Sequence, residues 1–212
     1  MNILCLNTAF DKANIALEYE GKTFYKETDA CCKHSENLLL EVEKLFENAK
    51  KETENSNDVI KNLDVISVVV GPGSFTGLRI SIATAKGLLA VFPNIKCVAI
   101  NSLELIAYSS AKIEKTAIIN GLSGFYFLAQ YNDKKETSAP KMISKEELNQ
   151  FNDFVSIENL PFETEIVDLT PKNLLLITKE KISKNLFVDE NNLVPLYLRP
   201  SQAEANLNGN KK

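Results

Sequence analysis

The feature that most constrains the fold is a six-residue run dominated by valine and isoleucine, residues 65–70, which leads directly into a glycine-rich segment. A β-branched run of this kind is typical of a strand that is buried on both faces of a sheet. Glycine lets the following turn reverse sharply, because it adopts positive φ without a steric penalty. Ser74 or Thr76 can then cap a helix by accepting an amide hydrogen bond. The segment therefore predicts a strand, a tight turn and a helix in an α/β domain.

The turn itself allows two interpretations. Seven residues form it: Gly71, Pro72, Gly73, Ser74, Phe75, Thr76 and Gly77. A helix N-terminus offers free amides and the positive end of the helix dipole, so an anion could bind there. The glycine spacing, however, matches neither a P-loop nor the dinucleotide fingerprint, and the serine lacks the flanking glycines of a nucleophile elbow. We interpret the segment as a structural turn, with direct anion binding as the alternative.

Length and composition narrow the class of protein. The 212 residues can form one large domain or two small ones, and 44% apolar with 25% charged residues is typical of a soluble globular protein. The net charge of −4 does not favour nucleic-acid binding by the chain as a whole. Four cysteines and one histidine fit no zinc pattern, so we predict no metal and no cofactor.

The same composition bears on where the chain resides. No stretch reaches transmembrane length, and the apolar run at the N-terminus is too short for a signal peptide. Cys5 and Cys97 fall in apolar, strand-like runs, which is simplest to explain in a reducing compartment. We predict a cytoplasmic protein with no membrane contact.

The rest of the chain continues the α/β pattern. Three antiparallel strands are predicted within the first 28 residues, followed by a helix over about 34–51 and a second helix over about 76–92. A capping-box signature at Asn101 to Glu104 begins a third helix. This order of elements is what a ribonuclease-H-like half-domain requires. Shorter patterns follow, with a helix that starts at Pro171.

The two long predicted helices carry more apolar and small residues than one core requires. In the first helix, Leu38 and Val42 share a stripe whereas Leu40 lies off it, so more than one face is apolar. In the second, Gly87 costs about 1 kcal/mol relative to alanine, which predicts the close approach of another backbone at that position. That backbone can come from this chain or from a separate subunit.

Several motifs resemble the TsaB (YeaZ) family, a branch of the actin-like ASKHA superfamily. They lie at residues 7–8, 33–36, 71–79, 83–88, 102–104 and 195–199, so the resemblance is extensive over residues 1–106 and weaker beyond. It implies an α/β, actin-like (ribonuclease-H-like) fold of two half-domains, each a mixed sheet flanked by helices, with a reduced C-terminal half. We expect the half-domains at residues 1–103 and 104–200, followed by a polar tail at 201–212 that we expect to be disordered.

The resemblance also implies a function. Such proteins are scaffold subunits that bind the related TsaD protein and support tRNA N6-threonylcarbamoyladenosine modification at position 37, and a TsaE-type ATPase joins the larger assembly. We therefore expect a non-catalytic subunit without catalytic residues, which meets tRNA only indirectly and contacts TsaD through its first two helices. The residues predicted to form that contact are His34, Ser35, Leu38, Val42, Arg79, Ile80, Ala83 and Gly87. Without the partner, the same surface could pair two copies of the chain, so a homodimer in isolation is a further expectation.

The sequence departs from the family pattern at two places and leaves two enzyme classes as alternatives. Asn7 stands where the family usually has aspartate, which weakens an ATPase role, and residues 120–122 depart from the family's Asp-Ala-Arg. An actin-like small-molecule kinase or ATPase is the main alternative, but residues 125–208 contain no glycine with which to approach adenosine. A hydrolase that uses His34, Ser35 or Ser74 is a weaker alternative, because a lone histidine at a helix start is more often a cap.

The sequence allows two interpretations of Arg79. It is either a surface cation with a local partner or an interface anchor. Because it lies close to a helix N-terminus, it is poorly placed for the helix dipole, which favours a carboxylate outside the helix as its partner.

Overall fold

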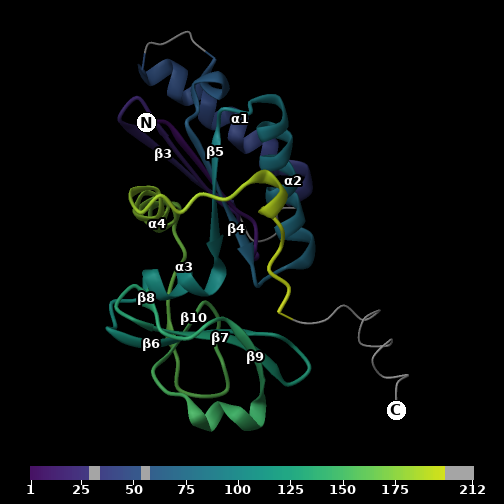
Figure 1. Ribbon diagram of the computed structural model, residues 1–212, viewed down its shortest axis with the longest axis vertical. Coiled ribbons are helices and arrows are strands. Elements are labelled where there is room, and N and C mark those ends of the chain that lie inside the picture. The colour runs from purple at the N-terminus through teal and green to yellow at the C-terminus, as the bar shows by residue number, and fades with distance from the viewer. Residues whose placement is uncertain (29–33, 54–57, 199–212) are drawn as a thin grey trace, which may run out of the picture.

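The computed structural model of the protein describes residues 1–28, 34–53 and 58–198, with side chains described from Asn37 onward in the second of these ranges. The predicted tail at residues 201–212 lies outside them. Two α/β halves are stacked along the long axis of the molecule, each built around its own sheet (Figure 1).

The first sheet has five strands in the order β3-β2-β1-β4-β5. β1 pairs antiparallel with β2, and β2 with β3, whereas β1–β4 and β4–β5 are parallel. The strands are β1 (Ile3–Asn7), β2 (Asn14–Tyr19), β3 (Lys22–Glu27), β4 (Val65–Gly71) and β5 (Lys96–Asn101). Three antiparallel strands followed by parallel crossovers are the predicted ribonuclease-H-like pattern, and every residue of β4 is buried, as its sequence predicts.

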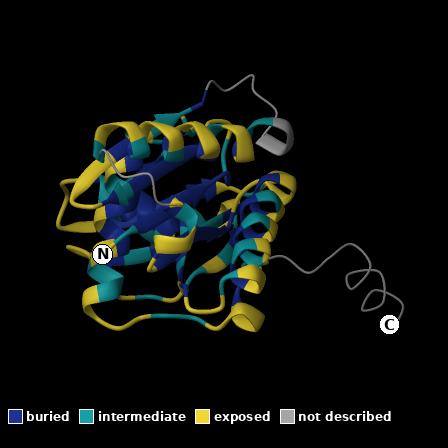
Figure 2. Ribbon diagram, turned by 90° about the horizontal axis from the view of Figure 1, so that it is seen from above, coloured by how far each residue is buried: buried dark blue, intermediate teal, exposed yellow. Residues whose placement is uncertain are grey.

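Helices cover both faces of this sheet. Ile3 and Cys5 of β1 point into one cluster, together with α3 (Ser102–Ser109) and α4 (Pro171–Ser183). Leu4 and Leu6 point into the other, beneath α1 (His34–Thr53) and α2 (Phe75–Val91). The alternation follows from the two-residue period of a strand. Seen from above, the buried sheet lies between helices whose outer faces are exposed (Figure 2).

The second sheet has six strands, five of them in the order β11-β10-β6-β7-β8, while β9 pairs with β7. Its strands are β6 (Glu114–Asn120), β7 (Phe125–Asn132), β8 (Lys135–Glu136), β9 (Lys141–Ser144), β10 (Phe154–Ser156) and β11 (Glu165–Ile166). The sheet mixes parallel and antiparallel pairs, since β10 runs parallel to β6 and β7 antiparallel to it. One face packs under α3, and most strands are short.

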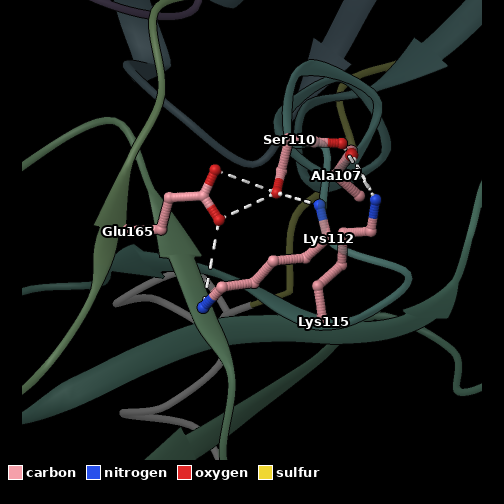
Figure 3. A network of polar contacts seen from close by, with 5 residues as sticks. All are labelled: Ala107, Ser110, Lys112, Lys115 and Glu165. Atoms are coloured by element: carbon pink, nitrogen blue, oxygen red, sulfur yellow. Dashed lines mark hydrogen bonds and ion pairs between the residues drawn. The ribbon is translucent and has the colours of Figure 1, made fainter.

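A polar network holds α3 to the second sheet (Figure 3). The Lys115 ammonium, on β6, donates to the Ala107 and Ser110 carbonyls at 3.1 Å each, at the C-terminal end of α3. The Ser110 hydroxyl donates to Glu165 of β11. Lys115 is almost fully buried, and this burial lowers its pKa. Because these two carbonyls lie at the C-terminal end of α3, the positive charge of Lys115 stands at the negative end of the helix dipole.

After the second sheet the chain returns to the first half. α4 packs across β1, β2 and β3, and Thr170 caps it by accepting from the Asn173 amide at 3.1 Å. Leu193 is fully buried in the cluster beneath α1 and α2, and the Leu196 amide donates to the Val70 carbonyl at 2.7 Å. Residues from 171 to 198 thus complete the first half, although they follow the second in sequence.

The predicted α/β fold with two mixed sheets flanked by helices is confirmed. The two long helices begin and end within two residues of their predicted limits. Short helical turns lie at η1 (Val59–Asn62), η2 (Lys145–Gln150) and η3 (Glu190–Asn192). β8 and β9 were not predicted from the sequence. These strands have two and four residues, which are too few to show a two-residue alternation. The limits at residues 103 and 200 stay a prediction.

Candidate functional site

The outer face of α2 presents a stripe of small and polar residues. Arg79, Ala83, Gly87 and Ala90 are all exposed, and the spacing of three and four residues places them on one side of the helix. No described atom lies within 4 Å of the place where a Cβ on Gly87 would stand. The close backbone approach predicted for Gly87 is therefore not made by the described part of this chain, and the surface above the glycine is open.

The inner face of α1 is buried in this chain's own core, whereas its outer face is exposed and open to the predicted contact. Leu38 and Val42 are buried in this chain's own core, so a partner cannot touch them directly. Leu39 and Leu40, by contrast, are 62% and 52% exposed. Glu41 forms an ion pair with Lys26 of β3, so Leu39 lies on the opposite flank of α1, toward α2.

The remaining predicted contact residues also include both buried and exposed side chains. Ile80 is half-buried and packs against the core cluster beneath α1 and α2, whereas Arg79 and Ala83 beside it are exposed. His34 and Ser35 lie outside the residues whose side chains the structure describes. Sequence reasoning omitted Leu39 from the contact, although its place on α1 relative to Leu38 was already available from the helical period.

The glycine turn packs against the end of β1. A Cβ on Gly77 would lie 1.9 Å from the Thr8 carbonyl oxygen, and one on Gly73 would lie 2.6 Å from that of Ala9. Separations under 3.0 Å cannot be tolerated against backbone. Only glycine lets α2 start this close to the loop that follows β1.

Hydrogen bonds fix that approach. The Ser74 amide donates to the Ala9 carbonyl at 2.8 Å, and the Thr8 hydroxyl donates to the Gly77 carbonyl at 2.6 Å. The Ser74 hydroxyl caps α2 by accepting from the Gly77 amide at 3.2 Å. Two of the amides that an anion would need at this helix start are therefore already bound to protein oxygens.

A cleft of about 1620 Å³ lies between the two halves. Its walls come from the loop after β1, the glycine turn, the start of α2, the end of β6 and residues 196–198. Five charged side chains line it: Asp11, Lys12, Arg79, Glu158 and Asp168. Three acids against two bases give no excess of positive charge for a polyphosphate.

The end of β1 also lacks the chemistry of a metal site. Asn7 is fully buried, and its Oδ1 accepts from the Ala9 amide at 3.0 Å. Among the described residues, no group of three histidine, cysteine, aspartate or glutamate side chains could hold a metal ion. No helix in the described part of the chain is long and apolar enough to cross a bilayer.

Comparison with known proteins identifies the family. The family model of TsaD, tRNA N6-adenosine threonylcarbamoyltransferase, matches residues 28–183. The tRNA threonylcarbamoyladenosine biosynthesis protein TsaB of Buchnera aphidicola subsp. Schizaphis graminum is 30% identical over 134 residues, 61% of this chain and 60% of that protein. The chain belongs to the TsaD family, and this relative to its TsaB branch.

Other members of the TsaB branch are more distant. TsaB of Haemophilus influenzae is 24% identical over 115 residues, 54% of this chain and 45% of that protein. The matched segments thus span about half the length of these curated relatives. YeaZ from Pseudomonas aeruginosa has a TM-score of 0.72 at 18% identity and covers 93% of this chain and 99% of its own, which shows that the fold is shared.

Proposed function

We propose that the chain is a non-catalytic scaffold subunit that binds a TsaD-like protein and thereby supports tRNA N6-threonylcarbamoyladenosine modification at position 37. The observation that carries the proposal is the open stripe on α2, in which no described residue covers Gly87, beside the exposed Leu39 and Leu40 of α1. Exposed leucines next to small residues are typical of a surface on which another helix packs closely. The two curated relatives carry threonylcarbamoyladenosine biosynthesis in their names, which agrees with this function.

The proposed contact surface follows the structure of these helices. Leu39, Leu40, Arg79, Ala83 and Gly87 face the partner, while the buried Leu38 and Val42 hold α1 in place beneath them. The glycine turn, with its amides bound to Ala9 and Ser74, serves to position α2. In the larger assembly a TsaE-like ATPase joins, tRNA is met only indirectly, and the complex works in the cytoplasm.

The absence of catalysis by this subunit rests on the residues at the end of β1. An actin-like ATPase needs a carboxylate there, whereas this chain has the uncharged carboxamide of Asn7, whose Oδ1 already accepts from the Ala9 amide. The Thr8 hydroxyl is likewise committed to the Gly77 carbonyl. We expect negligible ATP hydrolysis by the isolated chain; turnover that is lost when Thr8 is replaced by valine would contradict the proposal.

The contact is tested by co-purification with the TsaD-like protein of the same organism. Gly87→Leu fills the open position and is expected to abolish binding while the chain stays folded, because the residue is exposed and a Cβ there meets no other part of the described chain. Lys172→Leu is the matched control, since it adds the same side chain to an exposed position on α4, on the other face of the sheet. Unchanged co-purification of the Gly87 variant would refute the surface.

The same surface predicts self-association of the isolated chain. Two copies can cover each other's exposed leucines when the partner is absent. Light scattering over a dilution series is expected to show a dimer that dissociates on dilution, and addition of the TsaD-like protein should displace it. A monomer at all concentrations would leave the hetero-contact as the only use of the surface.

A further inference from the structure

Three side chains form a compact cluster where α2 begins, and we call it the arginine clamp: Phe75, Arg79 and Tyr197. The Arg79 guanidinium carbon lies 3.7 Å from the centroid of the Phe75 ring. The Arg79 Nε–H donates to the Tyr197 hydroxyl at 3.2 Å. The two aromatic rings are stacked, with centroids 5.5 Å apart. Each member of the clamp therefore touches both others.

The clamp is built from parts that are held in place independently. Phe75 and Arg79 are one helical turn apart on α2, which the Ser74 cap and the contact with β1 fix at its start. Tyr197 is 118 residues further along the chain. It follows Leu196, whose amide is bound to the Val70 carbonyl at 2.7 Å. The guanidinium is thus oriented before any partner arrives, which lowers the entropy lost on binding.

All three members of the clamp are exposed. Phe75 is 54% and Tyr197 49% exposed, and Arg79 is exposed as well. In the described part of the chain, no carboxylate forms an ion pair with Arg79, although the protein carries a net charge of −4. Nε is used by Tyr197, which leaves the two terminal nitrogens of the guanidinium with their donors available.

We propose that the arginine clamp binds a carboxylate side chain of the protein that docks on α2; this inference rests on the proposed function and names the chemistry of one point of that contact. A guanidinium held over a ring, with its Nε bound to Tyr197, presents the two parallel N–H donors of its terminal nitrogens, the geometry that fits a carboxylate. Arg79, Ala83 and Gly87 follow one another at intervals of four residues, so a partner element that lies along the stripe ends over the clamp.

The surroundings favour a single carboxylate over a nucleic-acid backbone. Asp11, Glu158 and Asp168 line the cleft that Arg79 also lines. A phosphate chain led into this region would meet these acids, whereas one acidic side chain on a folded partner reaches Arg79 alone. Aromatic residues beside an arginine are also the composition of energetically dominant positions in protein interfaces.

The test is the affinity between the full chain and the TsaD-like protein, measured by calorimetry at low and high salt. Arg79→Lys keeps the charge but loses the planar fork, and we expect about tenfold weaker binding. Tyr197→Phe keeps the ring and removes the acceptor of the Nε–H, for which we expect about threefold weaker binding. Lys172→Gln, on α4, is the control and should bind as the wild type does.

A double-mutant cycle separates an ion pair from a general packing effect. Each exposed acid of the partner is changed to its amide and measured against wild type and Arg79→Gln, which removes the positive charge. One acid is expected to show strong coupling to Arg79, with a loss that is not additive, and a weaker salt dependence in either variant. Additivity for every acid would overturn the clamp.

The outcomes distinguish the two proposals. If the wild-type chain does not bind the TsaD-like protein, the proposed function fails and the clamp fails with it. If the wild type binds and Gly87→Leu abolishes binding, but Arg79→Lys binds as tightly as wild type, the clamp alone is wrong. If Arg79→Lys weakens only tRNA binding by the assembled complex, the clamp binds nucleic acid, and the proposal that it binds a carboxylate of the partner is overturned.

Discussion

The hydroxyl groups of Ser67 and Thr178 lie 2.8 Å apart in the buried core, although the two residues are 111 positions apart in the chain. Ser67 belongs to β4 at the centre of the first sheet, and Thr178 to α4, which arrives only after the whole second sheet. The Thr178 hydroxyl in turn donates to the Leu174 carbonyl at 2.7 Å. This polar contact therefore fixes the position in which α4 packs on the sheet.

Thr178→Val is expected to destabilise the protein by about 1–3 kcal/mol, because it leaves the Ser67 hydroxyl buried without a partner. Thr178→Ser keeps the hydroxyl and should cost less. The double change Ser67→Ala with Thr178→Val should recover part of the loss, since the Ser67 hydroxyl is then absent and only the weak thiol donor of Cys5 loses its acceptor. Urea unfolding of the four proteins measures this. Equal losses in the single and double variants would contradict the pairing.

Gly77→Ala and Gly87→Ala should act in opposite directions although both lie in α2. At Gly77 a Cβ would stand 1.9 Å from the Thr8 carbonyl oxygen, so the helix start must move and the fold should lose several kcal/mol. At Gly87 a Cβ would meet no other part of the described chain within 4 Å, and alanine is the better helix former by about 1 kcal/mol. Thermal unfolding should thus show a lower midpoint for the first variant and a higher one for the second.

Lys115→Met tests the network between α3 and the second sheet. Methionine matches the length of the lysine stem but cannot donate to the Ala107 and Ser110 carbonyls. Leaving these acceptors unsatisfied should cost about 1–3 kcal/mol. Hydrogen exchange is expected to increase at the C-terminal end of α3 and along β6, with little change in α1. Uniform loss of protection throughout the chain would mean that the network is not local in its effect.

Glu41→Gln should change the pH dependence of stability. Hydrogen bonding to Lys44, aided by Lys26, lowers the pKa of Glu41 below its ordinary value of 4.5. A depressed pKa means that the ionised form stabilises the fold: the contribution is present above pH 4.5 and is lost as the pH falls through the folded-state pKa. The wild type should therefore be more stable than Glu41→Gln at neutral pH, and the difference should vanish in acid.

Two measurements check this electrostatic origin. Urea unfolding at a series of pH values gives the difference directly, and added salt should reduce it at neutral pH, because the pair with Lys26 lies near the surface. A difference that stays constant from acid to neutral pH would show that packing, rather than charge, distinguishes the two side chains.

Much of the architecture could be predicted from local patterns. The valine run of β4, the 3.6-residue period of α1 and α2, and the Thr170-Pro171 start of α4 each act within one element, so the chain carries the signal in neighbouring residues. Such patterns also showed that Leu40 lies off the main apolar stripe of α1. They could not show which stripe the protein itself covers. Burial of Leu38 and exposure of Leu40 depend on where the sheet lies.

The contacts between distant segments were decided by the tertiary structure alone. Tyr197 carries no mark in the sequence that places it beside Phe75, and Thr178 none that places it on Ser67. The glycines of the turn were recognisable as a tight bend, but the carbonyls they must clear belong to Thr8 and Ala9. Local sequence determines the conformation of an element, whereas the choice of partner depends on how all the elements pack together, and that is settled by shape and burial over the whole chain.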